Sequence, residues 1–82
     1  MKEALYQEIE NAAARIHQDA MEAANSSNEL ARAAVYSLLE GESRFQNVRM
    51  MNDLTALKDA LTDALGLVEK LSAELDAKYW EA

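Results

Sequence analysis

Residues that could carry out chemistry are few in this chain of 82 amino acids. Cysteine is absent and His17 is the single histidine, so thiolate metal sites and clusters of several histidines are excluded. No catalytic motif surrounds His17, which we interpret as a surface or boundary residue. We therefore expect no catalytic site and no cofactor, and we do not expect an enzyme.

Carboxylates are the most abundant reactive groups, because 15 acidic residues outnumber 8 basic ones and give a formal net charge of −7. Asp59 and Asp63 stand four residues apart, a spacing that could hold a hard cation. The Glu-x-x-His pairs of diiron bundles are missing, so we expect a solvated acidic face and no metal site. The net charge disfavours direct binding to nucleic acid or to an anionic membrane, and it favours a protein partner with a basic surface.

A sharper alternative is acidic mimicry. Carboxylates spaced along a helical rod could imitate phosphates and occupy the nucleic-acid groove of a host defence complex, as an inhibitor encoded by a phage or mobile element would. Asp59 and Asp63 are the pair that we expect to contact such a partner. The full acidic set consists of Glu3, Glu8, Glu10, Asp19, Glu22, Glu29, Asp53, Asp59, Asp63, Glu69, Glu74 and Asp76.

The segment 42–51 differs in composition from the rest of the chain. It contains side-chain types that are enriched in protein interfaces, so it is a second candidate partner-binding site. The alternative is that the same residues close the core at one end of the molecule. The candidates are Arg44, Phe45, Arg49, Met50 and Met51.

The elements that must position these residues are helices. Proline is absent, glycine occurs twice, and the strong helix formers alanine, leucine and glutamate dominate. Apolar residues recur every three or four positions over about 3–40 and 44–79, which predicts an all-α protein with a single domain over 1–82. In the second stretch the predicted core stripe is Leu54, Leu57, Leu61, Ala64, Val68, Leu71 and Leu75.

Local signals predict a turn at 41–42. Gly41 suits the left-handed residue that follows a helix C-terminus, and Ser43 with Gln46 matches a capping box that opens the next helix. Ser26 with Glu29 matches a capping box too, which would break the first helix near 25–28. The heptad phase nevertheless continues through that segment, so a continuous or kinked helix and a break both stay open.

Folding the chain at 41–42 into an antiparallel helical hairpin brings together positions whose numbers add up to about 84. Apolar residues then meet at nearly every level, which favours a hairpin over the alternative three-helix bundle. A two-helix coiled coil leaves apolar residues uncovered, so we expect two hairpins to pair into a four-helix bundle, a homodimer. The predicted uncovered set is Tyr6, Tyr36, Leu39, Met50, Met51, Leu65 and Leu67.

These features predict a small, acidic, non-catalytic protein-interaction module that acts as a regulator, adaptor or inhibitor through its helical surface. A small-ligand-binding helical oligomer is a further alternative, with Tyr6, Arg15, His17 and Tyr36 as candidate contacts. The sequence shows neither a signal-peptide core nor a membrane-spanning run, so we expect the cytoplasm, or the host cytoplasm for a viral protein.

Overall fold

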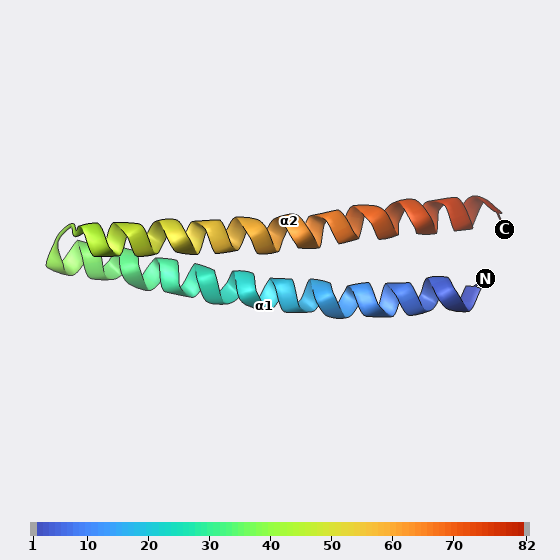
Figure 1. Ribbon diagram of the computed structural model, residues 1–82, viewed down its shortest axis with the longest axis horizontal. Coiled ribbons are helices and arrows are strands. Elements are labelled where there is room, and N and C mark those ends of the chain that lie inside the picture. Colours follow the sequence, from blue (N-terminus) through green and yellow to red (C-terminus); the bar gives the residue numbers. More distant parts are fainter. Residues whose placement is uncertain (1, 82) are drawn as a thin grey trace.

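The structure is a computed structural model. It describes the backbone of residues 2–81, and the side chains of that range except those at positions 2, 79 and 81. Two helices make up nearly all of it: α1 spans Lys2–Glu40 and α2 spans Arg44–Glu81. They run antiparallel, with the turn at one end and both ends of the described chain at the other (Figure 1). The predicted helical hairpin is therefore confirmed, and the three-helix alternative is wrong.

The turn forms where the local signals place it. Gly41 has a φ of +95° and its backbone N–H donates to the Ser37 carbonyl oxygen at 2.9 Å, which closes the last turn of α1. The Ser43 hydroxyl accepts from the backbone N–H of Gln46 at 3.1 Å and caps the start of α2. Both devices are local in sequence, which explains why they can be predicted without knowledge of the packing.

The segment 25–28 is continuous helix in α1. The capping box expected at Ser26 and Glu29 does not form, because Glu29 is an ion-pair partner of Arg49 on α2 and Ser26 is half-buried against that helix. Tertiary contacts thus use the residues that could have capped a new helix. The alternative of a break near 25–28 is wrong.

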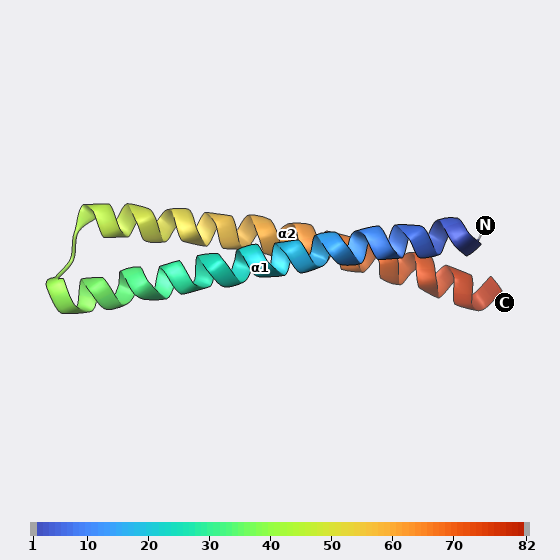
Figure 2. The same cartoon turned by 90° about the horizontal axis from the view of Figure 1, so that it is seen from below.

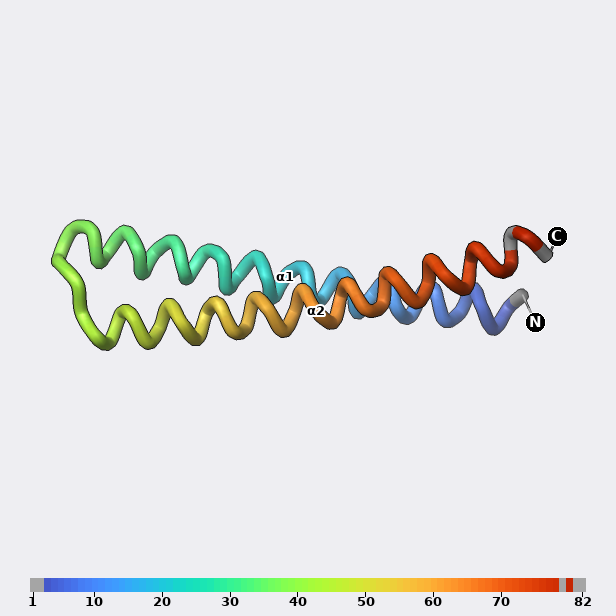
Figure 3. The backbone as a smooth tube through the Cα atoms, turned by 90° about the horizontal axis from the view of Figure 1, so that it is seen from above, coloured from blue at the N-terminus to red at the C-terminus, as the bar shows by residue number. Residues whose placement is uncertain are grey.

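The two helices cross as they run along the molecule. Viewed at right angles to Figure 1, α1 and α2 exchange sides near the middle of the hairpin (Figures 2 and 3). The extents of 61 × 16 × 14 Å describe a long rod that is nearly as deep as it is wide. This is the geometry of two helices that coil around each other along a heptad seam.

The helices meet along what we call the inner seam, whose positions alternate at spacings of four and three and are all buried or half-buried. On α1 the inner seam consists of Leu5, Ile9, Ala12, Ile16, Asp19, Ala23, Ser26, Leu30, Ala33 and Ser37. On α2 it consists of Gln46, Met50, Asp53, Leu57, Ala60, Ala64, Leu67, Leu71, Glu74 and Lys78. Among the side chains that the structure describes, the buried ones are alanines: Ala12, Ala23, Ala33 and Ala60.

The predicted core stripe of α2 is only partly right. Leu57, Ala64 and Leu71 belong to the inner seam as predicted. Leu54, Leu61, Val68 and Leu75 lie one residue beyond the seam and keep 43 to 55% of their surface exposed. Leu67 and Met50, expected on the uncovered side, are half-buried in the seam instead. The helix is thus rotated by about one residue, or 100°, from the most leucine-rich orientation.

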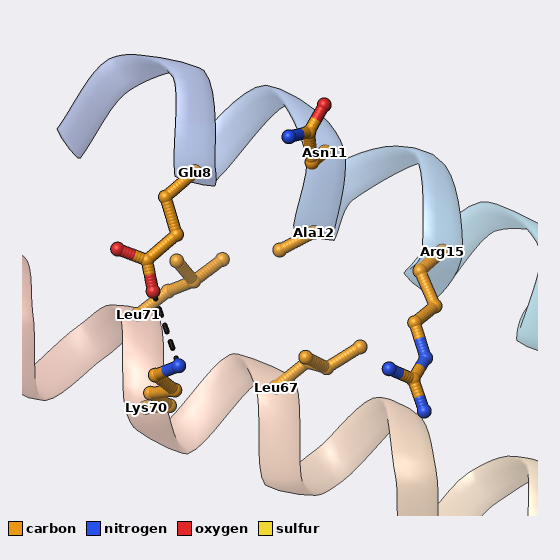
Figure 4. Close-up of a pocket in the computed structure, with 7 residues that line it drawn as sticks. All are labelled: Glu8, Asn11, Ala12, Arg15, Leu67, Lys70 and Leu71. Carbon is orange, nitrogen blue, oxygen red and sulfur yellow. Dashed lines mark ion pairs between the residues drawn. The ribbon is translucent and has the colours of Figure 1, made fainter. Parts of the chain in front are cut away.

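The register of the hairpin agrees closely with the prediction. Every inner-seam position of α1 has a counterpart on α2 such that the two residue numbers add up to 83. Ala12 and Leu71, for example, line the same cleft from opposite helices (Figure 4). The pairing of Ile16 with Val68, which the predicted register also implies, is wrong because Val68 lies outside the seam.

Candidate interaction surfaces

One side of the hairpin carries ion pairs between the helices. Arg15 pairs with Asp63 at 2.5 Å, Arg49 with Glu29 at 2.5 Å and Lys70 with Glu8 at 3.2 Å. In each pair the two residue numbers add up to 78, and each residue directly precedes an inner-seam position. In an antiparallel pair such positions share one face, so the three ion pairs define what we call the ion-pair face. Exposed pairs of this kind contribute about 0–1 kcal/mol each and chiefly favour one register.

Two carboxylate pairs lie beside these ion pairs. A hydrogen bond to the Asp63 carboxylate raises the pKa of Asp19, and partial burial adds to the effect. The same hydrogen bond, together with Arg15, lowers the pKa of Asp63. Near the open end, partial burial raises the pKa of Glu74, and the neighbouring Glu8 adds to it. Acid therefore protonates Asp19 before Asp63, because one proton can be shared between the two carboxyl groups.

The opposite side of the hairpin is apolar. On α2 it carries Leu54, Leu61, Val68 and Leu75, seven residues apart, each directly after an inner-seam position. The equivalent positions of α1 include Ala13, Ala20 and Ala34. We call this side the apolar face. Large hydrophobic side chains at a regular seven-residue spacing are unusual on a free helix surface, because they form the stripe that a neighbouring helix covers.

A second apolar surface, the tip, surrounds the turn. Leu38 and Leu39 end α1 with 84% and 78% of their surface exposed, and Phe45 opens α2 with 72% exposed. Val48 follows one turn later at 52%. Arg44 is exposed beside Phe45. The tip thus combines exposed leucines with an aromatic and an arginine side chain, and the latter two types are enriched in protein interfaces.

The seven predicted partner-binding residues separate into two groups. Arg44, Phe45, Met51 and Asp59 are exposed and available to a partner. The other three take part in the pairing of α1 with α2: Arg49 through Glu29, Asp63 through Arg15, and Met50 through its place in the inner seam. The segment 42–51 therefore serves both of the roles that its composition allowed, since it closes the hairpin and presents a surface.

The acidic rod is less continuous than its sequence pattern indicates. Glu8, Glu29 and Asp63 are held in ion pairs, and Asp19, Asp53 and Glu74 face the inner seam. Exposed members of the predicted set are Glu3, Glu10, Glu22, Asp59, Glu69 and Asp76. Asp76 also accepts a hydrogen bond from the indole N–H of Trp80 at 3.1 Å. The Asp59–Asp63 pair in particular is divided, because only Asp59 faces solvent.

A cleft of about 200 Å³ lies between the helices near their open end (Figure 4). Its two cations, Arg15 and Lys70, are already paired with Asp63 and Glu8, so the cleft offers no free charge to an anionic ligand. Of the predicted small-ligand contacts only Arg15 lines it. His17 is exposed on α1. Among the described residues no three His, Cys, Asp or Glu side chains converge as a metal site would require.

Sequence reasoning missed Leu38 and most of the apolar face as exposed surfaces, although Met51 and Leu65 of that face are exposed as predicted. The sequence of α2 does contain a signal for the apolar face, because its apolar residues form two stripes of heptad spacing that lie one residue apart. The sequence of α2 alone does not indicate which stripe packs on α1. That choice also depends on α1, where small residues and ion-pairing residues alternate.

Neither helix of the described chain contains a stretch long and apolar enough to cross a membrane. Comparison with models of protein families, with curated proteins and with solved structures finds no match. The function must therefore be argued from the surfaces themselves.

Proposed function

We propose that this protein is a small, acidic, non-catalytic interaction module that binds a protein partner through its tip. The observation that supports the proposal is the exposure of Leu38, Leu39 and Phe45 at 72 to 84% around a well-capped turn. An ordered helical hairpin gains nothing for its own stability from such side chains. A partner with an apolar pocket would bury them at little entropic cost, because both helix ends are already fixed.

The charge of the module indicates the kind of partner. With a net charge of −7, and with exposed Glu40 and Glu42 flanking Gly41 at the turn, the tip approaches a basic surface most readily. We therefore propose a protein partner whose apolar pocket is rimmed by basic residues. The roles of a regulator, an adaptor and an inhibitor are all compatible with this mode of binding. Cytoplasmic residence, in a cell or in the host cell of a virus, stays a prediction.

Acidic mimicry and small-ligand binding stay alternatives without an observation that favours them. Mimicry needs a continuous row of free carboxylates, and half of the predicted set is used in the pairing of the helices. Ligand binding needs convergent polar groups in a concave site, and the cleft of Figure 4 has its charges neutralised.

The double substitution of Leu39→Ala with Phe45→Ala tests the tip. We expect it to weaken capture of the partner by about 2 kcal/mol or more, roughly thirtyfold, because apolar anchors dominate interface energies. The measurement is affinity capture with tagged wild-type and variant chains, followed by titration calorimetry with the captured protein. Helicity followed by circular dichroism should be unchanged, since both side chains are exposed.

Met21→Ala is the matched control, because Met21 is a large hydrophobic residue on α1, exposed at 56% and far from the turn. It should leave capture unchanged. Equal capture by the tip variant and the wild-type chain would refute the assignment of the tip.

A further inference from the structure

Each helix carries a second seam, which we call the outer seam, one residue after its inner seam. On α2 it consists of Asn47, Met51, Leu54, Lys58, Leu61, Leu65, Val68, Ser72 and Leu75. On α1 its central part consists of Ala13, His17, Ala20, Ala24, Ser27, Ala31 and Ala34. One residue turns an α-helix by 100°, so each outer seam points nearly at right angles to the direction of the other helix.

The outer seam of α2 is the more hydrophobic of its two seams. Six of its nine side chains are large and apolar, and these six expose 43 to 63% of their surface. The inner seam of α2 includes Gln46, Asp53, Glu74 and Lys78 among its ten residues. Helix α1 therefore covers the less apolar side of α2. The better hydrophobic stripe faces away from α1, at the angle where the second neighbour of a helix lies in a four-helix bundle.

Both outer seams belong to the apolar face. In an antiparallel helix pair, the residues that follow inner-seam positions on one helix lie on the same side as those on the other. The ion pairs of Arg15 with Asp63, Arg49 with Glu29 and Lys70 with Glu8 occupy the other side. One face of the hairpin thus carries the ion pairs. The opposite face carries two seams side by side, one with large side chains on α2 and one with small side chains on α1.

We propose that a second copy of this chain covers the apolar face, so that two hairpins form a four-helix bundle with α2 of each copy packed on α1 of the other. This goes beyond the tip assignment and does not depend on it. The two surfaces share only Leu38, which follows the inner-seam residue Ser37 where the α1 outer seam reaches the tip, whereas Leu39 and Phe45 lie off the outer seams.

The exposed area supports a second copy as the occupant. The chain exposes 6477 Å², whereas a compact monomer of 9.1 kDa exposes about 4,900 Å². The excess of roughly 1,600 Å² is about twice the 800 Å² that each partner contributes to a standard stable interface. Covering one long face by an identical hairpin would remove area on this scale.

The two seams are complementary in size when the two-fold axis runs along the rod. Such an axis keeps every residue at its own level, so the register between copies follows from the register within one hairpin. Inner-seam numbers add up to 83, so residues at one level, within a hairpin or between the two copies, have numbers that add up to 83. The level of each small α1 residue then falls between two α2 residues of the second copy: Ala20 between Leu61 and Leu65, Ala24 between Lys58 and Leu61, and Ala31 between Met51 and Leu54.

The polar residues of the outer seams match in part. Lys58, the charged residue of the α2 outer seam, lies next to Ser27 of the second copy and can donate to its hydroxyl. Ser72 lies next to Ala13, whereas His17 lies between the apolar Leu65 and Val68. The other antiparallel arrangement, with α2 on α2, places large side chains on large ones and alanines on alanines. Because helix axes in a bundle stay about 8–10 Å apart, alternating large and small partners fill the space more evenly.

The first test is the oligomeric state of the full chain, measured by light scattering at tens of micromolar. We expect a wild-type mass of twice 9.1 kDa. Leu61→Glu with Leu65→Glu should raise the dimer dissociation constant by on the order of a hundredfold, because it buries charges without partners. Met21→Glu with Val35→Glu is the matched control, exposed at 56% and 54% off the outer seam of α1, and should stay dimeric. A folded wild-type monomer, or equal effects of both variants, would overturn the proposal.

The second test keeps the hairpin intact, and it decides the matter if the glutamate variant does not fold. The chain has no cysteine, so single cysteines report contacts directly. Ala24→Cys chains mixed with Leu61→Cys chains should form a disulfide-linked heterodimer under mild oxidation, because these positions face each other across the proposed interface. A linked heterodimer of Leu61→Cys with Leu65→Cys in its place would show α2 on α2, and would overturn the arrangement.

Discussion

At the scale of single residues, the inner seam is unusual for the carboxylates that it holds. Asp19, Asp53 and Glu74 each have a carboxylate oxygen that is shielded from solvent and makes no hydrogen bond within the described chain. Asp19 stands next to Asp63, and the repulsion between them is only partly offset by Arg15. The two negative charges of Asp19 and Asp63 thus lower the stability of the hairpin at this level of the inner seam.

Asp19→Asn should raise the thermal midpoint at pH 7. A raised pKa in the folded state means that Asp19 stabilises the fold when protonated, below its unfolded pKa, and that this contribution is lost as pH rises through the folded pKa. Asparagine keeps a donor for Asp63 and carries no charge. The rise in thermal midpoint should shrink as the pH falls into the acid range, because Asp19 of the wild-type chain is then protonated too. Thermal melts at several pH values measure it.

The exposed Asp59→Asn serves as control for the loss of one negative charge, because Asp59 lies four residues before Asp63 on the outside of α2. If the thermal midpoint of the control variant rises as much as that of Asp19→Asn at pH 7, repulsion between Asp19 and Asp63 is not the cause of the stabilisation.

At the scale of the elements, the two glycines have opposite roles. Gly41 occupies the left-handed region that the turn requires, with φ at +95°, whereas Gly66 lies in regular α2 helix. A Cβ atom at Gly66 would meet nothing within 4 Å, so the packing of the described residues does not require a glycine there.

Gly66→Ala should therefore stabilise the protein by about 1 kcal/mol, because alanine loses less backbone entropy in a helix. The thermal midpoint should rise by about 4–8 °C for a domain of this size. Gly41→Ala should instead lower stability by about 1 kcal/mol, since an L side chain is strained at positive φ. Parallel chemical and thermal melts compare the two variants. A destabilised Gly66→Ala chain would indicate that something outside the hairpin approaches this position.

The elements show how far sequence reasoning reaches. The two helices and the turn follow from local chemistry at Gly41, Ser43 and Gln46, and from apolar periodicity. The rotation of α2 does not follow, because its leucines mark two stripes and the richer one faces away from α1. Only the alanines of α1, such as Ala12 and Ala23, and the charges that meet across the ion-pair face favour the observed orientation.

Of the candidate surfaces, Phe45 and Arg44 were predictable from residue type, whereas Leu38 was not, because its heptad position resembles a core position.

At the scale of the whole molecule, the core of one hairpin is thin. Among the residues described only alanines are buried, and fifteen large hydrophobic residues are exposed. A chain of this size usually needs support beyond its own core, and without cysteine it cannot obtain that support from disulfides. Association of copies would supply it.

The thermal midpoint should consequently rise with protein concentration. If folding and dimerisation are coupled, a hundredfold increase in concentration stabilises the folded state by on the order of 3 kcal/mol. Circular dichroism melts between low and high micromolar concentrations provide the measurement. The Leu61→Glu, Leu65→Glu variant should melt at a midpoint independent of concentration, and a concentration-independent wild-type midpoint would count against coupled assembly.

The single turn between two long helices also has a consequence for the order of folding. Facing residues are close in sequence next to Gly41 and nearly the whole chain apart at the open end, so the entropy lost on closing each loop grows steadily along the rod. Contacts near the turn form most readily, and the pairing of α1 with α2 then proceeds from the turn towards the termini. The open end, where Glu8 pairs with Lys70, is the last part to assemble and the first to separate.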